Sequence, residues 1–96
     1  MADEELPIFV HWERTLGDLL DRTARFPKAV RFTFTSRIDN AALDIVDKIV
    51  EARYAKGSRK ARLLQQIDVL LARLRILLRL CNQRRYLDNK GYECLS

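Results

Sequence analysis

The sequence predicts an all-α fold: an antiparallel up-down four-helix bundle with a short fourth helix, forming one domain over residues 1–96. The chain has 96 residues, enough for one hydrophobic core, and 48% of them are hydrophobic. Its three Gly and two Pro leave little material for the many turns of an all-β fold. Three long segments repeat apolar residues with the period of a helix, and a shorter segment follows them.

The first predicted helix covers about residues 8–25. At about 100° per residue, one of its faces is apolar and the opposite face is charged. The apolar face consists of Phe9, Trp12, Leu16, Leu19, Leu20 and Thr23. The stretch “RFPK” ends this helix, because Pro27 disfavours helical geometry at the residue before it and can open the next helix.

The second predicted helix covers about residues 28–54 and has a core stripe and an acidic outer face. The core stripe consists of Phe34, Ile38, Ala41, Ala42, Ile45 and Ile49. The outer face consists of Asn40, Asp44, Asp47 and Glu51. One stretch, “VRFTFT”, alternates with the period of two that is typical of a strand. A single strand would have no partner elsewhere in the chain, so we assign this stretch to the first turns of the helix.

The third predicted helix covers about residues 59–86 and follows the short connection “AKGSR”. Gly57 suits the position just past a helix end, and Ser58 suits an N-cap. So short a connection places the second and third helices antiparallel and adjacent. The core stripe of the third helix consists of Leu63, Leu64, Ile67, Leu70, Leu71, Leu74, Leu77, Leu78 and Cys81.

A fourth helix is predicted from about residue 89, with Asp88 as its N-cap. Residues 89–96 supply only about two turns at 3.6 residues per turn. We therefore expect this helix to cover the three longer ones only in part.

The third helix also carries apolar residues on the side opposite its core stripe. Val69, Ile76 and Leu80, together with Ala72, lie within about 40° of the position opposite the core. Single exposed hydrophobic residues are common, but a helix that is apolar on both faces is not expected to face water on either. We therefore expect this stripe to pack against another subunit, which predicts a homo-oligomer.

The basic residues are concentrated in the third helix, which contains eight of them against one acidic residue, whereas the whole chain has a net charge of +5. Arg62, Arg73 and Arg84 are spaced by eleven residues and form one column, with about 16 Å between successive members. Arg75 and Arg79 form a smaller group on the other flank. Two interpretations compete: contact with the phosphates of a nucleic acid, or pairing with the acidic second helix of a neighbouring subunit. The chain has no base-reading motif, so binding to nucleic acid would be backbone-driven and strongly salt-dependent.

The sequence contains no recognisable catalytic constellation, and we expect neither an enzyme, a metal site nor a cofactor. His11 is the only histidine and lies on the polar side of the first helix. Cys81 and Cys94 lack CxxC spacing and a histidine companion, which argues against zinc and favours packed thiols over a disulfide. Asp44 and Asp47 are one turn apart, which fits a solvated face better than a metal site.

The chain is expected to be a cytoplasmic protein that does not associate with membranes. No run approaches the roughly 18–20 apolar residues of a membrane span. The start, “MADEELP”, is acidic where a secretion signal would be basic. The basic helix also lacks a water-facing side opposite an apolar one, as a membrane-surface helix would have.

Four segments carry a resemblance that covers nearly the whole chain from about residue 9. They are “HWERTLGDLLDRTARFPKAVRF”, “SRIDNAALDIVDKIVEARYAKG”, “LLQQIDVLLARLRILLRLC” and “YLDNKGYE”. The most specific parts are “RFPK” with the Arg and Phe of “VRF”, then “EARY”, then “LRILLRL”. In this order the segments resemble the Avd-like accessory proteins of diversity-generating retroelements. Proteins encoded in intervening sequences of bacterial 23S ribosomal RNA genes look similar in outline.

The resemblance implies a four-helix bundle that assembles into a homopentameric, barrel-like ring with a basic surface. In that family the protein has no catalysis of its own; it binds the element's reverse transcriptase and template RNA and supports mutagenic cDNA synthesis. Five copies would carry about +25, which attracts RNA, with DNA as a second candidate. The residues expected to contact nucleic acid or the polymerase are Arg62, Arg73, Arg75, Arg79 and Arg84, and those expected at the subunit interface are Val69, Ile76 and Leu80. Family members continue past “YE” into a full fourth helix, so only part of that helix is expected here.

The alternative is a purely structural helical module that oligomerises without binding nucleic acid. In that case the basic stripe pairs with the acidic second helix across subunits, and RNA is not retained even at low salt. A steep loss of retention between about 50 and 200 mM salt would favour phosphate contact instead.

Overall fold

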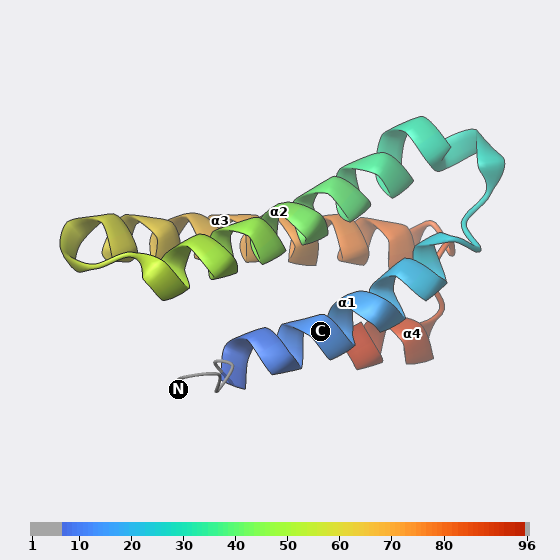
Figure 1. Ribbon diagram of the computed structural model, residues 1–96. Coiled ribbons are helices and arrows are strands. Elements are labelled where there is room, and N and C mark those ends of the chain that lie inside the picture. The colour runs from blue at the N-terminus through green and yellow to red at the C-terminus, as the bar shows by residue number, and fades with distance from the viewer. Residues whose placement is uncertain (1–6, 96) are drawn as a thin grey trace.

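A computed structural model describes the backbone of residues 7–95 and the side chains of residues 10–95. Over this range the chain forms four α-helices and no strand (Figure 1). The helices are α1 Pro7–Thr23, α2 Ser36–Tyr54, α3 Gly57–Gln83 and α4 Asn89–Leu95. The predicted all-α helical bundle is therefore confirmed.

The segment between α1 and α2 is helical but is not part of either helix. A short 3₁₀ helix, η1 (Lys28–Val30), leads into one π-helical turn, η2 (Arg31–Thr35), and α2 follows directly. The helical assignment of “VRFTFT” is confirmed. The predicted start of the second helix at residue 28 is wrong for the α-helix itself, which begins eight residues later.

The π turn leads directly into α2 and is closed by hydrogen bonds that span five residues. Ser36 donates hydrogen bonds from its backbone N–H and from its hydroxyl to the carbonyl oxygen of Arg31, five residues earlier. Such a turn contains more residues than an α turn and shifts the helical phase. Phe34, which belongs to the predicted core stripe, is half-buried, whereas Phe32, about 200° away around the helix, is exposed to solvent.

α2 and α3 form an antiparallel hairpin and lie side by side, as predicted from their short connection (Figure 1). Gly57 has a φ of 61°, in the left-handed region that glycine adopts without steric penalty. The structure places Lys56 at the N-cap of α3, and no side chain caps this helix end. The predicted N-cap role of Ser58 is therefore wrong, because the chain enters the helix at Gly57, two residues earlier than predicted.

The core lies where α1, α2 and α3 face one another, and most of its residues come from the predicted stripes. The buried residues that the three helices contribute to the main cluster are Trp12, Leu19, Ile38, Ala41, Ala42, Ile45, Ile49, Ile67, Leu74, Leu78 and Cys81. Leu16, Phe34, Leu70, Leu71 and Leu77 are partly buried around this cluster. The predicted core residue Phe9 lies outside the described side chains.

Leu64 was predicted to lie in the core, but its side chain is exposed. It lies near the start of α3, where the α2–α3 hairpin extends past α1 and α4 (Figure 1). Only α2 is available to cover α3 at this end, and a single neighbour covers one narrow face of a helix. The small cluster of Ala52, Ala55 and Leu63 is what that face buries.

α3 ends at Gln83, three residues before the predicted boundary. Arg84 is its C-cap, and Arg85 has a φ of 66°, which is the left-handed conformation that commonly terminates helices. The backbone N–H groups of Tyr86 and Leu87 then donate to the carbonyl oxygen of Cys81, at 2.9 and 3.3 Å. These bonds turn the chain back toward α4.

α4 is short and packs against α1 and α3. The predicted N-cap is confirmed, because Asp88 Oδ1 accepts a hydrogen bond of 2.6 Å from the backbone N–H of Gly91. Gly91 is buried, and a Cβ atom there would lie 2.6 Å from Arg22 Nη1. Glycine therefore allows the guanidinium group of α1 to approach α4. A hydrogen bond of 3.1 Å to Asp18 raises the pKa of Arg22.

Candidate functional site

The five arginines predicted to contact nucleic acid or a polymerase all have exposed side chains along the length of α3. They are Arg62, Arg73, Arg75, Arg79 and Arg84. None of them takes part in an ion pair or a side-chain hydrogen bond within the described residues 10–95. Their positive charges are therefore available to a partner. The local environment differs from one arginine to another.

Arg75 and Arg79 are one turn apart and lie together near the end of the chain. Both line a shallow pocket of about 210 Å³ between α3 and α4, with Ile76 and Tyr92 among its other residues. They are the two members of the predicted set that line the same pocket. An anionic group entering from solvent can contact both.

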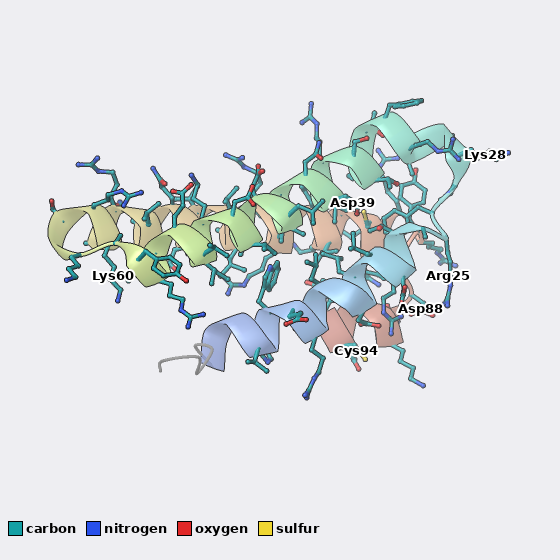
Figure 2. All side chains as sticks on the ribbon, in the orientation of Figure 1. Arg25, Lys28, Asp39, Lys60, Asp88 and Cys94 are labelled. Atoms are coloured by element: carbon teal, nitrogen blue, oxygen red, sulfur yellow. The ribbon has the colours of Figure 1, made fainter. Side chains whose placement is uncertain are left out.

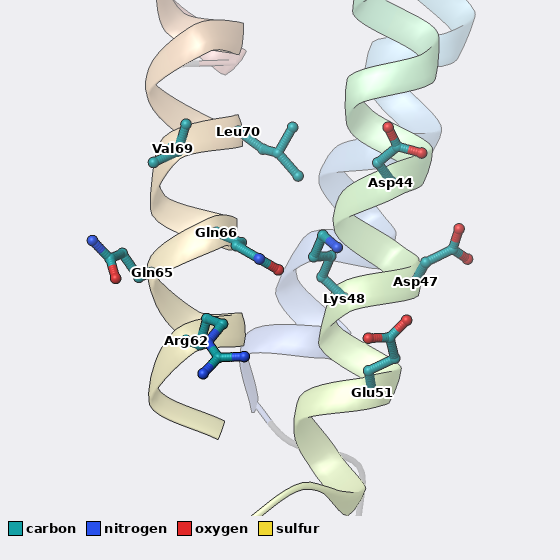
Figure 3. Close-up of a pocket in the computed structure, with 9 residues that line it drawn as sticks. All are labelled: Asp44, Asp47, Lys48, Glu51, Arg62, Gln65, Gln66, Val69 and Leu70. Carbon is teal, nitrogen blue, oxygen red and sulfur yellow. The ribbon is translucent and has the colours of Figure 1, made fainter. Parts of the chain in front are cut away.

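Arg62 has a different environment, because it lines a groove of about 680 Å³ whose opposite wall is acidic (Figure 3). That wall belongs to α2 and carries the carboxylates of Asp44, Asp47 and Glu51, with Lys48 between them (Figure 3). Three carboxylates repel a phosphate that approaches Arg62. Arg62 is therefore the member of the set least suited to nucleic acid and best suited to a partner of mixed charge.

The predicted interface residues form an exposed apolar stripe on α3. The exposed fractions are 53% for Val69, 51% for Ile76 and 39% for Leu80, and Ala72 is also exposed. Arg73 lies between Val69 and Ile76 along the helix, so apolar and basic side chains share one outward surface. Contiguous exposed apolar residues rimmed by charge are a common property of protein interfaces.

A second outward apolar surface lies on α2 and was not predicted from the sequence. Leu43, Val50 and Tyr54 are exposed, and their spacings of seven and four residues place them on one face of the helix. The Arg53 guanidinium lies 5.8 Å from the centre of the Tyr54 ring, a cation–π contact at the end of α2. The spacing alone was a sufficient signal, and at about 100° per residue the acidic residues of α2 lie beside this surface rather than opposite it.

A partly open apolar groove of about 340 Å³ lies between α1, α2 and α3. Trp12, Ile67 and Leu71 are among its lining residues, and Cys94 and Leu95 of α4 lie at its edge. His11 also lines it but is exposed, as predicted. His11, Thr15 and Arg75 are among its polar lining residues, and the Thr15 hydroxyl already donates to the backbone carbonyl oxygen of His11.

The chemistry available to the described residues 7–95 is limited. No group of three or more His, Cys, Asp or Glu side chains in this range is arranged to hold a metal ion. Cys81 and Cys94 are both free thiols. Cys81 is packed in the bundle as predicted, and its burial raises the pKa of the thiol to about 11. Cys94 is exposed, so the prediction of a packed thiol is wrong for this residue. None of the helices in this range has the length and apolar character required to cross a bilayer.

No protein family, curated protein or solved structure was found to match this chain.

Proposed function

We propose that this chain is a non-enzymatic, oligomeric basic scaffold that binds a retroelement reverse transcriptase and its template RNA and supports mutagenic cDNA synthesis. The observation that carries the proposal is the outward surface of α3, where unpaired guanidinium groups alternate with exposed apolar side chains. The resemblance of the segments around “RFPK”, “EARY” and “LRILLRL” supplies the retroelement and the polymerase.

Two distinct apolar surfaces favour assembly into a homopentameric ring over a symmetric dimer. Val69 and Ile76 mark the surface on α3, and Leu43 and Val50 mark the surface on α2. A ring requires two different complementary patches on each subunit, whereas a two-fold dimer pairs one patch with itself. Contact between the α3 stripe of one copy and the α2 surface of the next satisfies the ring requirement.

Arginine is suited to phosphate because its planar guanidinium donates two parallel hydrogen bonds. Arg73, Arg75, Arg79 and Arg84 are the members of the predicted set that lie away from the acidic groove. Repetition of this array around a ring would give a basic surface able to track the backbone of RNA, or of DNA.

The experiment is a filter-binding titration of RNA between about 50 and 200 mM salt. The double substitution Arg73→Gln/Arg84→Gln should weaken binding and make the plot of log Kd against log salt less steep by about 1 to 2 units. Arg14→Gln/Lys56→Gln removes the same charge at two exposed positions elsewhere and serves as the control. Circular dichroism should report equal helicity for all three proteins. If the α3 pair and the control behave alike, the phosphate contacts of α3 are refuted.

The second candidate is the structural module without nucleic-acid binding, and the groove at Arg62 favours it. There an arginine of α3 already faces three carboxylates of α2 across open space, which is the charge pairing that this function needs between subunits. In this case the wild-type protein retains no RNA at 50 mM salt, and its assembly weakens as salt rises. Co-purification with a retroelement reverse transcriptase, tested with and without ribonuclease, then distinguishes a polymerase partner from RNA bridging.

A further inference from the structure

Basic and aromatic side chains gather at the end of the bundle where α1 passes into η1 and where α3 passes into α4. We propose that this end, here called the basic tip, binds a single-stranded segment of nucleic acid. The basic tip consists of Arg25, Lys28, Arg31, Phe32, Arg84 and Arg85. The inference rests on the proposed function and specifies which form of nucleic acid it takes, at a surface separate from the middle of α3.

An aromatic cluster holds the two segments of the tip together. The Tyr86 ring lies between Phe26 and Phe34, with ring centroids 6.2 and 5.8 Å apart. Because Phe26 is buried and follows Arg25, and Tyr86 follows Arg85, the flanking arginines are brought to the same end of the molecule. All five cations of the tip are exposed, and Figure 2 shows Arg25 and Lys28 at this end.

The positive charge of the tip is not neutralised locally. The sequence has no Asp or Glu from residue 22 to 38, or from residue 69 to 87. The carboxylates closest to the tip in sequence are those of Asp21, Asp39 and Asp88. Asp39 accepts a hydrogen bond of 2.8 Å from Thr23, and Asp88 accepts the N–H of Gly91. None of the five cations forms an ion pair within residues 10–95.

Phe32 is the aromatic residue of the tip that the fold does not use. Its side chain is 85% exposed, whereas Phe26 and Phe34 of the same segment pack against Tyr86. It directly follows Arg31 in the π turn. An exposed aromatic face beside guanidinium groups is the arrangement on which proteins stack unpaired bases, because every base has a π face and its phosphate lies within reach of the cations.

Two features of the tip reduce stability, which indicates that its charge has a purpose other than folding. Arg85 adopts the left-handed conformation, in which glycine would be free of steric strain. Arg31 lies at the N-terminal end of the η2–α2 helical run, where the helix dipole disfavours a cation. The helix dipole stabilises a cation near the C-terminal end of a helix, which explains the positive charge of Arg25 after α1 and of Arg84 after α3. It does not explain the positive charge of Lys28 or Arg31.

The test compares a labelled single-stranded oligouridine with an RNA duplex of equal length, by fluorescence anisotropy at low salt. Phe32→Ala should weaken binding of the single strand by about 5- to 150-fold, which is the loss of one stacked base, and should leave duplex binding unchanged. Phe32→Trp should bind at least as well as the wild type. Phe32→Leu keeps the apolar bulk but lacks a π face, and it should behave like Phe32→Ala.

The substitution Arg85→Gly provides a second test, whose expected result cannot be explained by misfolding of the variant. Relief of the left-handed strain should raise Tm by several degrees, about 4 to 8 °C, while binding of the single strand weakens. A variant that becomes more stable and binds less well has lost a contact with the ligand. Unchanged binding by both Arg85→Gly and Phe32→Ala would overturn the proposal.

The results of these experiments distinguish a failure of the basic tip proposal from a failure of the proposed scaffold function. If Arg73→Gln/Arg75→Gln weakens RNA binding but the tip variants do not, the tip fails and the scaffold function stands. If the wild-type protein binds no RNA at low salt, both fail. If the tip variants lose a protein partner and keep full single-strand affinity, the tip is a protein-docking surface and the proposal is wrong.

Discussion

The indole N–H of Trp12 donates a hydrogen bond to the backbone carbonyl oxygen of Ala42, with Nε1 and O 3.3 Å apart. This bond joins α1 to α2 across 30 residues of sequence, and both residues are buried. It fixes the rotation of α1 about its own axis, because the indole reaches that carbonyl from one orientation only. The same ring also lines the apolar groove between the helices.

Substitution of Trp12 by Phe should lower the free energy of unfolding by about 1–2 kcal/mol, through loss of the hydrogen bond and of part of the buried ring. Urea titrations followed by circular dichroism measure this difference. Trp12→Ala should lower it by about 3–5 kcal/mol. If the Phe variant is as stable as the wild type, the bond contributes nothing to the docking of α1.

Substitution of Ile76 by Asp should reduce the oligomeric state, because it places a charge in the centre of the α3 stripe. Multi-angle light scattering at micromolar concentration measures the mass. Gln83→Asp introduces the same charge at an exposed position near the end of α3, and it should leave assembly unchanged. A wild-type protein that is monomeric at these concentrations contradicts the scaffold function.

Substitution of Val50 by Asp tests how the copies meet. In a ring, the α2 surface of one copy contacts the α3 stripe of the next, so this variant should dissociate as Ile76→Asp does. When the two variants are mixed, the intact α3 stripe of Val50→Asp can contact the intact α2 surface of Ile76→Asp. The mixture should therefore form a dimer with a single interface. If Val50→Asp assembles normally, the α3 stripes pair with themselves and the ring is excluded.

Among the five predicted arginines, Arg62 should contribute least to RNA binding, because three carboxylates line the groove beside it. Arg62→Gln should change the Kd for RNA less than Arg73→Gln does, in filter binding at low salt. Asp47→Asn/Glu51→Gln should tighten binding by removing repulsion. Equal effects of the two arginine substitutions would show that the acidic wall does not influence the bound RNA.

The buried thiol of Cys81 should make stability depend on pH above neutrality. Burial raises its pKa to about 11 from an ordinary value of 9.0, so between these values the unfolded chain loses a proton that the folded protein keeps. The folded state therefore loses stability as pH rises from about 9 to about 11. Cys81→Ala lacks this effect, so the stability difference between wild type and variant should shrink over the same interval.

Alkylation provides an independent measurement of the same thiol. Cys94 is exposed and should react with iodoacetamide at pH 8, whereas Cys81 should react only after unfolding. Peptide mass spectrometry assigns the modified residue. Rapid modification of Cys81 in the native protein would contradict its buried position.

Much of the fold followed from the sequence, because helical periodicity reports the face that a helix buries. The stripes containing Ile45 in α2 and Leu74 in α3 were predicted correctly for this reason. Periodicity does not report how far a neighbouring helix extends, and so Leu64 was placed in the core although α1 does not reach it. It also assumes a constant pitch, which the π turn before Ser36 interrupts.

The candidate site was predicted less completely than the fold. The sequence gave no indication that Arg62 would lie beside a groove with three carboxylates, since that groove depends on the relative positions of α2 and α3. Helical periodicity does place Phe34 in the core stripe and Phe32 on the opposite side, but it gave no indication that basic residues of distant segments would lie at the same end of the molecule as Phe32. The function of a surface depends on how the helices are positioned relative to one another, and the residue pattern within one helix does not encode those positions.

The short connection between α2 and α3 has a consequence for synthesis on the ribosome. Contacts between these helices close small loops and can form as soon as α3 emerges, which favours fast folding. α1 leaves the exit tunnel first, but the surfaces that bury Trp12 and Leu19 do not exist until about fifty more residues have been translated. During those seconds the apolar face of α1 has no partner within the chain.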